Sequence, residues 1–362
     1  MIESLRNKFV KERFDLQEIL LVPVFATVLA LLIGCFFLLA TGESFANIFV
    51  AYSSLFIGSL GSLNAISETF TAATPLVFAA LGIALAFRAG LFNIGAEGQM
   101  IIGGLATVIV GFSIDFLPIW IHLPLALSIG ALFGALYAAI AGWLKAYTGA
   151  HEVISTIMLN LIALRLLDYV LRSPIIQKEG RNDPISKSIL DSAELPQILA
   201  FIDPQLRLHG GFLLMLFAVF FIYWLLFHTT IGYEFRATGA NPNAAKYAGI
   251  KAGLTIVLVM AIAGALAGLA GANQITGILG RASPGFSASI GFDAIAVALL
   301  GRSHPIGVLF AGLLFGALIA GGRLMQVKAG VSVDLITIIQ ALIIVFIAAP
   351  LLIKKSLPWF FK

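Results

Sequence analysis

The chain has 362 residues, of which 60% are hydrophobic and only 11% are charged. Its mean hydropathy is +1.03, whereas soluble globular proteins carry roughly 25% charged residues. These values exclude a soluble globular protein and predict an integral membrane protein. The formal net charge of +4 does not indicate nucleic-acid binding, because no basic block is dense and the cytoplasmic loops of membrane proteins are basic in any case.

Apolar runs of about 20 residues recur along the chain, and each can cross roughly 30 Å of hydrocarbon as a helix. The weak alternation of outer-membrane strands is absent, so we expect an all-α polytopic membrane protein. Cys35 is the only cysteine, which excludes an intrachain disulfide and a cysteine-based metal site. The residues before Cys35 resemble a lipoprotein processing box. The apolar run continues to Ala40, however, and is too long for a cleaved signal.

The predicted elements give ten spans between two cytoplasmic ends. The N-terminal segment 1–18 mixes basic and acidic residues and is expected to be a short interfacial helix. The transmembrane domain is expected over 19–353, followed by a basic cytoplasmic tail at 354–362. The spans are predicted at 19–40, 69–88, 100–116, 125–145, 153–171, 211–229, 252–272, 287–300, 306–319 and 333–353.

The connections complete this topology. Residues 44–60 are apolar but short, and we interpret them as a re-entrant or interfacial piece on the outside. The long hydrophilic loop 172–210 is expected to be external, and the segment 231–251 to be cytoplasmic. Pro118 and Pro124 are expected to bracket the turn before the fourth span.

Two blocks of the predicted topology have opposite orientation. The second to fifth spans and the seventh to tenth spans each contain a Gly-interrupted polar break, one near Asn93 and one near Gly285. Inverted repeats of this kind are typical of transporters, whose substrate path lies at the repeat interface. Arg323 and Lys328, expected between the ninth and tenth spans, argue mildly against the orientation.

The break at Phe92-Asn93-Ile94-Gly95-Ala96-Glu97-Gly98-Gln99-Met100 places three polar side chains inside an apolar sequence. Unpaired polar groups in hydrocarbon cost several kcal/mol each, so Asn93, Glu97 and Gln99 need partners, water or a ligand. They either bond a polar substrate or stabilise the break. In the alternative interpretation, Glu97 pairs with Arg88 and only fixes the turn.

Other polar residues have similarly open roles. Asn160 and Glu152 lie one span later. Structural capping and interhelical bonding explain them as well as a functional role does. Asp293 is a candidate for capping a half-helix that faces the cavity. His151 and His304 have no partners at metal-ligand spacing, which indicates solvated or capping roles, and we predict no metal site.

A short isolated helix is specified after the sixth span. Asn241 is a favoured N-cap, Pro242 a favoured first helical residue and Gly249 a favoured stop, so we predict a helix over Pro242 to Ala248. A helix of this length is marginal alone in water. It is therefore expected to rest on the membrane surface or a partner protein, the alternative being a capped loop helix without a further role.

Four segments carry a resemblance to a known family. They are Gly-Leu-Phe-Asn-Ile-Gly-Ala-Glu-Gly-Gln from 90, Glu-Val-Ile-Ser-Thr-Ile-Met-Leu-Asn from 152, Gly-Ala-Asn-Pro-Asn-Ala-Ala from 239 with Gly249 and Ile250, and Gly-Phe-Asp-Ala-Ile-Ala-Val-Ala-Leu-Leu-Gly from 291. Together they resemble the permease subunits of ATP-binding-cassette importers, in the ribose and branched-chain amino acid branch and most of all its nucleoside permeases. Ribose-type relatives carry Gly-Ile-Asp-Leu-Ser-Val-Gly at the first segment, and this difference favours nucleosides over sugars. His151 departs from the asparagine typical of nucleoside-type relatives.

The resemblance implies a permease fold of about ten helices with inverted repeats in a bacterial cytoplasmic membrane. It implies three kinds of partner: ATPase subunits that bind ATP and Mg, a second related permease, and an extracytoplasmic substrate-binding protein or lipoprotein. It makes Pro242 to Ala248 the coupling helix that sits in a groove of the ATPase. Contacts to the ATPase are then expected from Arg236, Gly239, Asn241, Pro242, Ala244, Ala245, Lys246 and Gly249. The substrate path is expected to involve Asn93, Glu97, Gln99, Asn160 and Asp293.

Three other kinds of membrane protein are alternatives to a nucleoside permease. A permease for a sugar such as ribose shares the family resemblance. An ion-coupled secondary transporter needs a buried acidic residue, whereas the acids here lie near predicted span ends. A membrane enzyme needs a convergent nucleophile or metal constellation, and we find none in the sequence. The chain contains no Gly-x-x-x-x-Gly-Lys-Ser/Thr phosphate loop, so we expect no ATP hydrolysis by this chain itself and no cofactor bound to it.

Overall fold

The computed structural model describes residues 16–332 and 334–348. The predicted tail at 354–362 and most of the predicted N-terminal segment lie outside the described residues. Within them the chain is helical, with two isolated bridges in the long loop and no strand. This confirms the all-α class.

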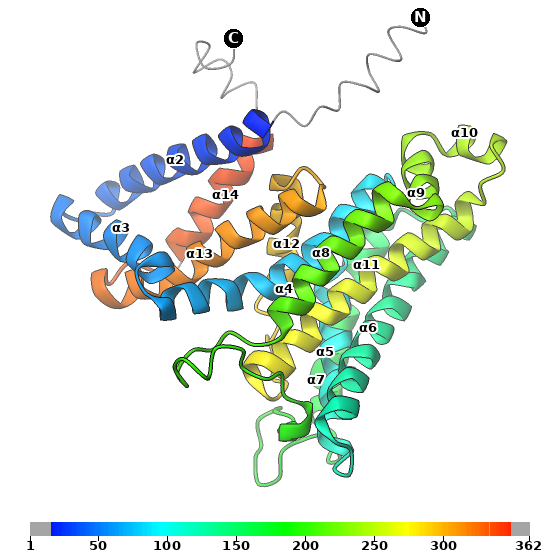
Figure 1. The fold of residues 1–362 in the computed structure, drawn as a ribbon, viewed down its shortest axis with the longest axis horizontal. Coiled ribbons are helices and arrows are strands. Elements are labelled where there is room, and N and C mark those ends of the chain that lie inside the picture. Colours follow the sequence, from blue (N-terminus) through cyan, green and yellow to red (C-terminus); the bar gives the residue numbers. More distant parts are fainter. Residues whose placement is uncertain (1–15, 333, 349–362) are drawn as a thin grey trace, which may run out of the picture.

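The helices occur in the following order (Figure 1): α2 (Leu16–Ala40), α3 (Phe45–Leu60), α4 (Leu63–Arg88), α5 (Ala96–Ser113), α6 (Ile119–Trp143) with η1 (Leu144–Thr148), α7 (Glu152–Leu171), η2 (Asp191–Ala193), α8 (Gly211–His228), α9 (Thr230–Ala240), α10 (Pro242–Tyr247), α11 (Ala252–Gln274) with η3 (Ile275–Leu279), α12 (Ile290–Leu300), α13 (Pro305–Ala329) and α14 (Asp334–Ala348). By length and composition, α4, α5, α6 with η1, α7, α8, α11 with η3, and α13 can each cross a membrane. Shorter apolar stretches come from α2, α3, α12 and α14.

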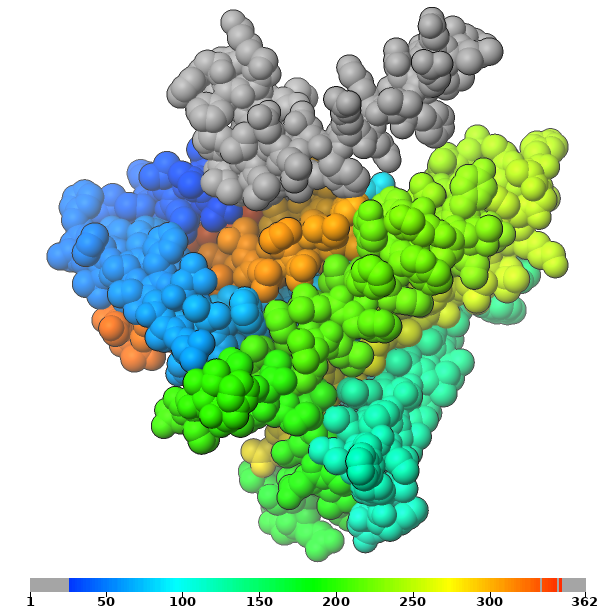
Figure 2. Space-filling model, viewed as in Figure 1, coloured from blue at the N-terminus to red at the C-terminus, as the bar shows by residue number. Residues whose placement is uncertain are grey.

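The helices form two groups on either side of α4 (Figure 1). One group contains α2, α3, α13 and α14, and the other contains α5, α6, α7 and α11. In the space-filling view, α8 and the loop before it cross the face of the molecule between the blue α3–α4 region and the teal α6 (Figure 2). Large apolar side chains of α8, including Phe217 and Phe220, are exposed there, as expected of a helix that faces lipid.

The helix contacts follow the two predicted repeats. Helix α6 packs against α11, and correspondingly α13 packs against α4. Likewise α5 contacts α11 and α7, while α12 contacts α4 and α14. Exchanging α4, α5, α6 and α7 for α11, α12, α13 and α14 therefore reproduces the same set of neighbours, which is the arrangement that a pair of internal repeats produces.

Small residues allow the closest of these contacts. Gly134 of α6 lies against Gly264 and Gly268 of α11, and further along the two helices Gly142 lies against Met260. The residue number falls on one helix as it rises on the other, so the two helices are antiparallel. Close backbone approach through glycine is the usual basis of helix association in membranes, where lipid is as apolar as the side chains.

Helix α13 continues ten residues past the end of the predicted ninth span, to Ala329, and the prediction was wrong in placing Arg323 and Lys328 in a connection. Both residues lie within α13. Its glycines, Gly321 and Gly322, pack against α3 and α14 rather than ending the helix. The charge of Arg323 is met by Glu68 of α4, at 3.2 Å.

The N-terminal boundaries of two other predicted spans were also wrong. Pro124 lies inside α6, which begins after Pro118 at its N-cap. Because Pro124 has no N–H, the helix lacks one hydrogen bond of its ladder, the one to the carbonyl of Trp120. Helix α5 begins at Ala96, so Glu97 and Gln99 belong to its first turn rather than to a loop.

The short apolar segment before α4 forms α3, which packs mainly against α13 and also contacts α4 and α2. Asn47, near its start, donates to the carbonyl of Ala329 at 3.0 Å. Near its end, Gly58 packs against Gly321 and Leu324. The chain then turns directly into α4, which runs the remaining length of α13.

Candidate functional site: a helix break held by polar side chains

The polar signature connects α4 to α5 and is buried. Asn93 is 1% exposed and Gln99 is 2% exposed. Their side-chain amides exchange two hydrogen bonds, from Asn93 Nδ2 to Gln99 Oε1 at 3.0 Å and from Gln99 Nε2 to Asn93 Oδ1 at 2.9 Å. Asn93 Oδ1 also accepts from the Gly95 amide at 3.0 Å. The two side chains therefore satisfy each other and fix the turn that starts α5.

Asn160 of α7 holds the same segment from the other side. Its Nδ2 donates to the carbonyl of Ile94 at 2.9 Å, and its Oδ1 accepts from the amide of Gly98 at 2.8 Å. Gly98 packs directly on Asn160, with no room for a β-carbon. Asn160 thus binds backbone that the break has left without helical partners.

Glu97 joins the two breaks. Its carboxylate accepts from Ser287 Oγ at 2.5 Å and from the amide of Gly291 at 2.8 Å, at the start of α12. Gly291 lies against the backbone of Glu97, so the N-termini of α5 and α12 meet. A carboxylate is stabilising at such a terminus because the helix dipole is positive there. The carboxylate bonds α12, whereas Arg88, its alternative partner, donates to the carbonyl of Ser303 at 2.9 Å.

The backbone before α12 is strained. Ala288 and Ser289 have φ values of 48° and 61°, a left-handed conformation that non-glycine residues adopt at a cost of order 1–3 kcal/mol. The bonds from Glu97 to Ser287 and Gly291 bracket this pair. Asp293, one turn into α12, is partly exposed and lies within electrostatic range of Glu97.

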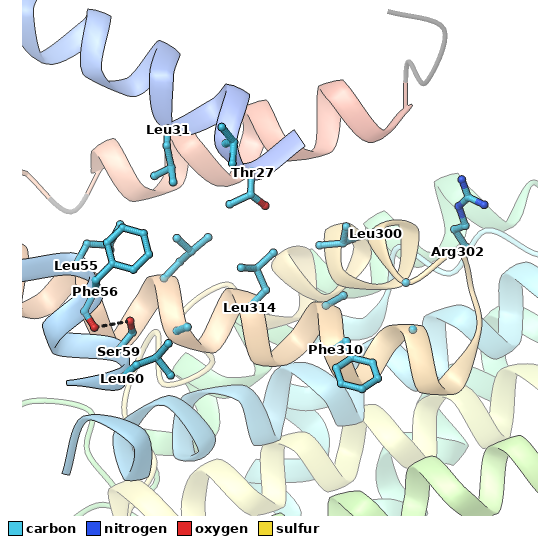
Figure 3. A pocket seen from close by; sticks show the side chains of 16 residues that line it. Thr27, Leu31, Leu55, Phe56, Ser59, Leu60, Leu300, Arg302, Phe310 and Leu314 are labelled. Carbon is cyan, nitrogen blue, oxygen red and sulfur yellow. Dashed lines mark hydrogen bonds between the residues drawn. The ribbon is translucent and has the colours of Figure 1, made fainter. Parts of the chain in front are cut away.

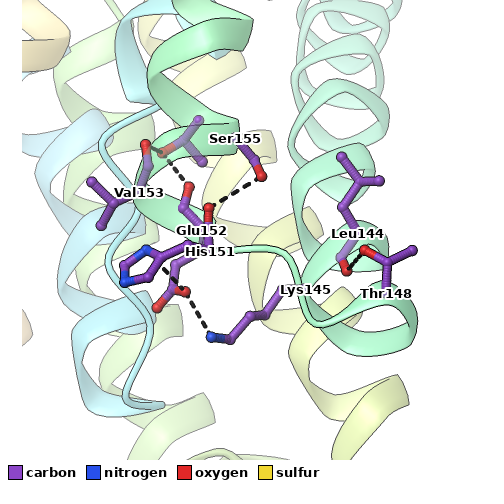
Figure 4. Close-up of polar contacts among 8 residues, drawn as sticks. Leu144, Lys145, Thr148, His151, Glu152, Val153 and Ser155 are labelled. Atoms are coloured by element: carbon purple, nitrogen blue, oxygen red, sulfur yellow. Dashed lines mark hydrogen bonds and ion pairs between the residues drawn. The ribbon is translucent and has the colours of Figure 1, made fainter.

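A second polar hinge joins α6 to α7 (Figure 4). Helix α6 ends in the π-helical turn η1, and Gly149 follows in the left-handed region with φ +75°. Lys145 Nζ lies 2.9 Å from Glu152 Oε2, and His151 Nδ1 lies 3.9 Å from the same oxygen. Glu152 therefore ties the start of α7 back to the end of η1, which agrees with a structural role.

The predicted isolated helix is present as α10. Asn241 is its N-cap and accepts from the amides of Asn243 and Ala244, and Pro242 is its first residue. Gly249 ends the turn after it with φ +86°. Most of α10 is exposed, but Ala245 is 3% exposed and faces the protein itself.

The sequence did not reveal α9, the helix that carries α10. Gly239 of α9 packs on the backbone of Arg88 and Ala89, and Gly90 packs on Gly239 in turn. Helix α9 therefore touches the end of α4, shortly before the polar signature. Arg236 stacks over the ring of Phe227 at 5.5 Å, which fixes α9 to the end of α8.

An apolar cavity of about 420 Å³ lies between α2, α3 and α13 (Figure 3). Leu31, Phe56, Phe310 and Leu314 are among the residues that line it. Such a lining offers few partners for a polar ligand. The cavity is also separate from the meeting point of α5 and α12, so we do not place a polar substrate in it.

The structure thus brings together all five residues predicted for the substrate path. Asn93 and Gln99 bond each other, Asn160 bonds the backbone beside them, and Glu97 links this group to α12, which carries Asp293. The residues predicted to couple to a partner form a separate group on α9 and α10. Sequence reasoning missed Ser287, the second partner of Glu97, because nothing local distinguishes this serine from others in a Gly- and Ser-rich connection.

Comparison with known proteins identifies one matching family. The family described as "Branched-chain amino acid transport system / permease component" matches residues 65–348. The guanosine ABC transporter permease NupP of Bacillus subtilis is 40% identical over 337 residues, covering 92% of this chain and 94% of NupP. The nucleoside ABC transporter permease NupB of Lactococcus lactis is 37% identical over 342 residues, covering 93% of each chain.

More distant matches widen the comparison. The glucose ABC transporter permease TsgB13 of Haloferax volcanii is 35% identical over 339 residues, covering 92% of this chain and 88% of TsgB13. Bacillus subtilis has a second guanosine permease, NupQ, which is 28% identical over 262 residues, covering 69% of this chain and 79% of NupQ. No solved structure matches.

Proposed function

We infer that this chain, which belongs to the family of permease components of branched-chain amino acid transport systems, is the membrane-spanning subunit of an ATP-driven nucleoside importer. The observation that carries the substrate class is the identity of 40% to a guanosine permease over more than nine-tenths of both chains. The polar signature around Asn93 and Glu97, which favours nucleosides over ribose, supports the same assignment.

Partners are part of this proposal. Separate ATPase subunits supply ATP and Mg binding, because the sequence contains no phosphate loop of its own. A second, related permease completes the path, as the occurrence of both NupP and NupQ in one bacterium supports. An extracytoplasmic binding protein or lipoprotein delivers the substrate. We place the chain in a bacterial cytoplasmic membrane with α10 and both termini on the cytoplasmic side.

We propose that the path passes the meeting point of α5 and α12. Half-helix N-termini that meet inside a membrane are a recurring substrate site in transporters. Asn93, Gln99, Asn160 and Glu97 already bond protein groups, so in this proposal they hold the break in shape. Asp293 is the member of the set with part of its side chain exposed, and we assign it the contact with substrate.

Coupling is assigned to α9 and α10. The exposed residues of α10, including Ala244, Lys246 and Tyr247, present a surface to the ATPase. Asn241, Pro242 and Gly249 fix the shape of that helix, while Ala245, Arg236 and Gly239 attach it to the rest of the molecule. Closure of the ATPases would move α9 against the end of α4 and switch the path between outward and inward facing.

A sugar permease is the second candidate, because a glucose permease is 35% identical over most of the chain. Uptake into proteoliposomes that contain the purified complex separates the candidates. We expect ATP-dependent uptake of labelled guanosine that excess unlabelled nucleoside abolishes and excess ribose or glucose leaves unchanged. ATP-dependent uptake of sugar instead would establish the second candidate. Uptake driven by a proton gradient without ATP would overturn the importer assignment.

A further inference from the structure

A second buried polar cluster lies at the end of α11 remote from α10. It comprises His209, in the loop before α8, and Asn273, which lies in the last turn of α11 and is followed in the chain by Gln274. These side chains are 0%, 1% and 9% exposed. Both ring nitrogens of His209, both amide atoms of Asn273 and the amide oxygen of Gln274 are buried without a hydrogen-bond partner.

His209 and Asn273 lie side by side. A β-carbon at Gly211 would touch both the Asn273 amide nitrogen and His209 Nδ1, so this glycine lies between the two side chains. A β-carbon at Gly277 would lie 2.6 Å from His209 Nε2, so the next turn packs on the imidazole ring. The two glycines bring the loop and α11 together around the unpaired atoms.

So many unpaired atoms in one place are unusual. More than about nine-tenths of buried polar groups in proteins are hydrogen-bonded, and an exception requires an explanation. His122, equally buried, shows the ordinary situation: it lies 2.8 Å from Ser192 Oγ and 3.1 Å from the carbonyl of Val110. The partners of the cluster are therefore to be sought outside the protein.

The chemistry of the cluster selects a neutral ligand with several donors and acceptors. An amide presents N–H₂ and C=O side by side, and a neutral imidazole presents one donor and one acceptor. Among the described residues no group of His, Cys, Asp and Glu could hold a metal ion. Arg207, two residues from His209, adds positive charge and disfavours a cation. The edge of a nucleobase and the hydroxyls of ribose match this pattern.

We propose that His209 and Asn273 form an external subsite that binds the polar groups of the nucleoside in transit. This inference rests on the proposed function, which supplies the class of substrate. It differs from the site at the α5–α12 break, where Asn93, Gln99 and Glu97 are satisfied by the protein.

The subsite is closed by a loop that can be opened from α4. The loop is a small hairpin in which the Gly210 amide donates to the carbonyl of Pro196 and the Ile198 amide to that of Leu208. The amide of Leu208 donates to Ser67 Oγ of α4 at 3.0 Å. The other end of α4 contacts α9, so one helix joins the coupling region to the loop that covers the subsite.

Uptake kinetics test the proposal with the complete complex in proteoliposomes. Asn273→Leu and His209→Phe preserve size while removing hydrogen-bonding groups. We expect each to raise the KM for guanosine at least tenfold while complex assembly and basal ATPase activity stay within twofold of wild type. Asn182→Leu, on the exposed part of the same external segment, is the matched control and leaves KM unchanged. His209→Asn, which retains a donor and an acceptor, restores much of the affinity.

A direct binding measurement distinguishes a site that binds the nucleoside from a site that holds only buried water. Guanosine titrated into the purified complex should bind at least tenfold more weakly to either variant. Unchanged binding and unchanged KM in His209→Phe would overturn the subsite, even if Asn273→Leu failed to assemble. If binding and KM are unchanged in His209→Phe while the wild type imports guanosine, the subsite alone is wrong. If the wild type imports no nucleoside, the proposed function fails and the subsite with it.

Discussion

At the scale of single residues, Glu97 shows how the protein itself can satisfy a buried acidic side chain. Its carboxylate is buried and accepts two hydrogen bonds from the start of α12. A charged acceptor at a helix N-terminus inside a low-dielectric medium stabilises that terminus strongly. The acidic side chain is thus explained by the geometry of the two half-helices.

Removing this acceptor should destabilise the protein. Glu97→Ala leaves the amide of Gly291 and the hydroxyl of Ser287 buried without a partner, which costs about 1–3 kcal/mol for each group. We expect a lower midpoint of thermal denaturation in detergent, with Glu97→Gln in between because it retains an acceptor. Glu179→Ala, at a side chain that is 90% exposed, is the control. Equal midpoints for the two alanine variants would contradict the capping role.

His209 gives a prediction about pH. Burial, with a further contribution from the charge of Arg207, lowers the pKa of His209 from 6.5 to about 4. Because the folded protein holds this imidazole neutral, acid favours the unfolded chain, where it is protonated below pH 6.5. Stability should therefore fall as the pH decreases from 6.5 to 4, by about 3 kcal/mol at most.

The measurement is the denaturation midpoint of the wild type and of His209→Phe between pH 7 and pH 4. The variant should lose less stability over this interval than the wild type. His151→Phe serves as the control, since this imidazole side chain is 65% exposed. The same pH dependence in wild type and His209→Phe would show that His209 is not the group responsible.

Local and long-range residues differed in how far the sequence could predict them. The α10 helix was predicted closely, because Asn241, Pro242 and Gly249 act through backbone groups within a few residues of themselves. Asn160 was left with open alternatives, because its partners, Ile94 and Gly98, are more than 60 residues away. His209 was not singled out at all, since its neighbours on α11 become visible only when the helices are packed.

At the scale of elements, glycines decide how closely the helices pack. In α13, Gly321 and Gly322 lie against α3 and α14, and the helix continues past them to Ala329. In α6 and α11 the same residue type lets two backbones approach closely. Whether a glycine ends a helix or forms a contact surface depends on the neighbouring helix. A local sequence pattern carries no information about that neighbour.

A pair of substitutions in α11 tests this interpretation. A β-carbon at Gly268 would meet the carbonyl of Gly130 across the α6–α11 contact, whereas at Gly253 the nearest atom is Ala146 Cβ at 3.8 Å. We expect Gly268→Ala to destabilise the protein by about 1–3 kcal/mol through overpacking. Gly253→Ala should be neutral or stabilising by up to about 1 kcal/mol, because alanine is the better helix former. Thermal denaturation of both variants is the measurement, and equal effects would contradict the close-packing role.

At the scale of the whole molecule, α4 connects the parts that matter for transport. One end holds the loop 172–210 through Ser67, and the other touches α9 and leads into the polar signature. Helix α4 is also largely buried and packs against α11, α12 and α13. A displacement of α9 is therefore transmitted to a rigid helix rather than absorbed by a loop, which is the kind of element that links distant sites.

This connection predicts a variant that separates ATP hydrolysis from transport. Gly239→Leu forces α9 away from Arg88 and Ala89 but leaves the exposed surface of α10 unchanged. The ATPase should still assemble and hydrolyse ATP, because we propose that it contacts α10, while the uptake of guanosine per ATP hydrolysed falls at least tenfold. The adjacent Ala240→Leu, at an exposed position on the same helix, should keep the wild-type ratio. Parallel assays of phosphate release and guanosine uptake in one proteoliposome preparation measure this ratio. If Gly239→Leu lost both activities because the ATPase no longer bound, α9 would be part of the docking surface rather than the link between the ATPase and α4.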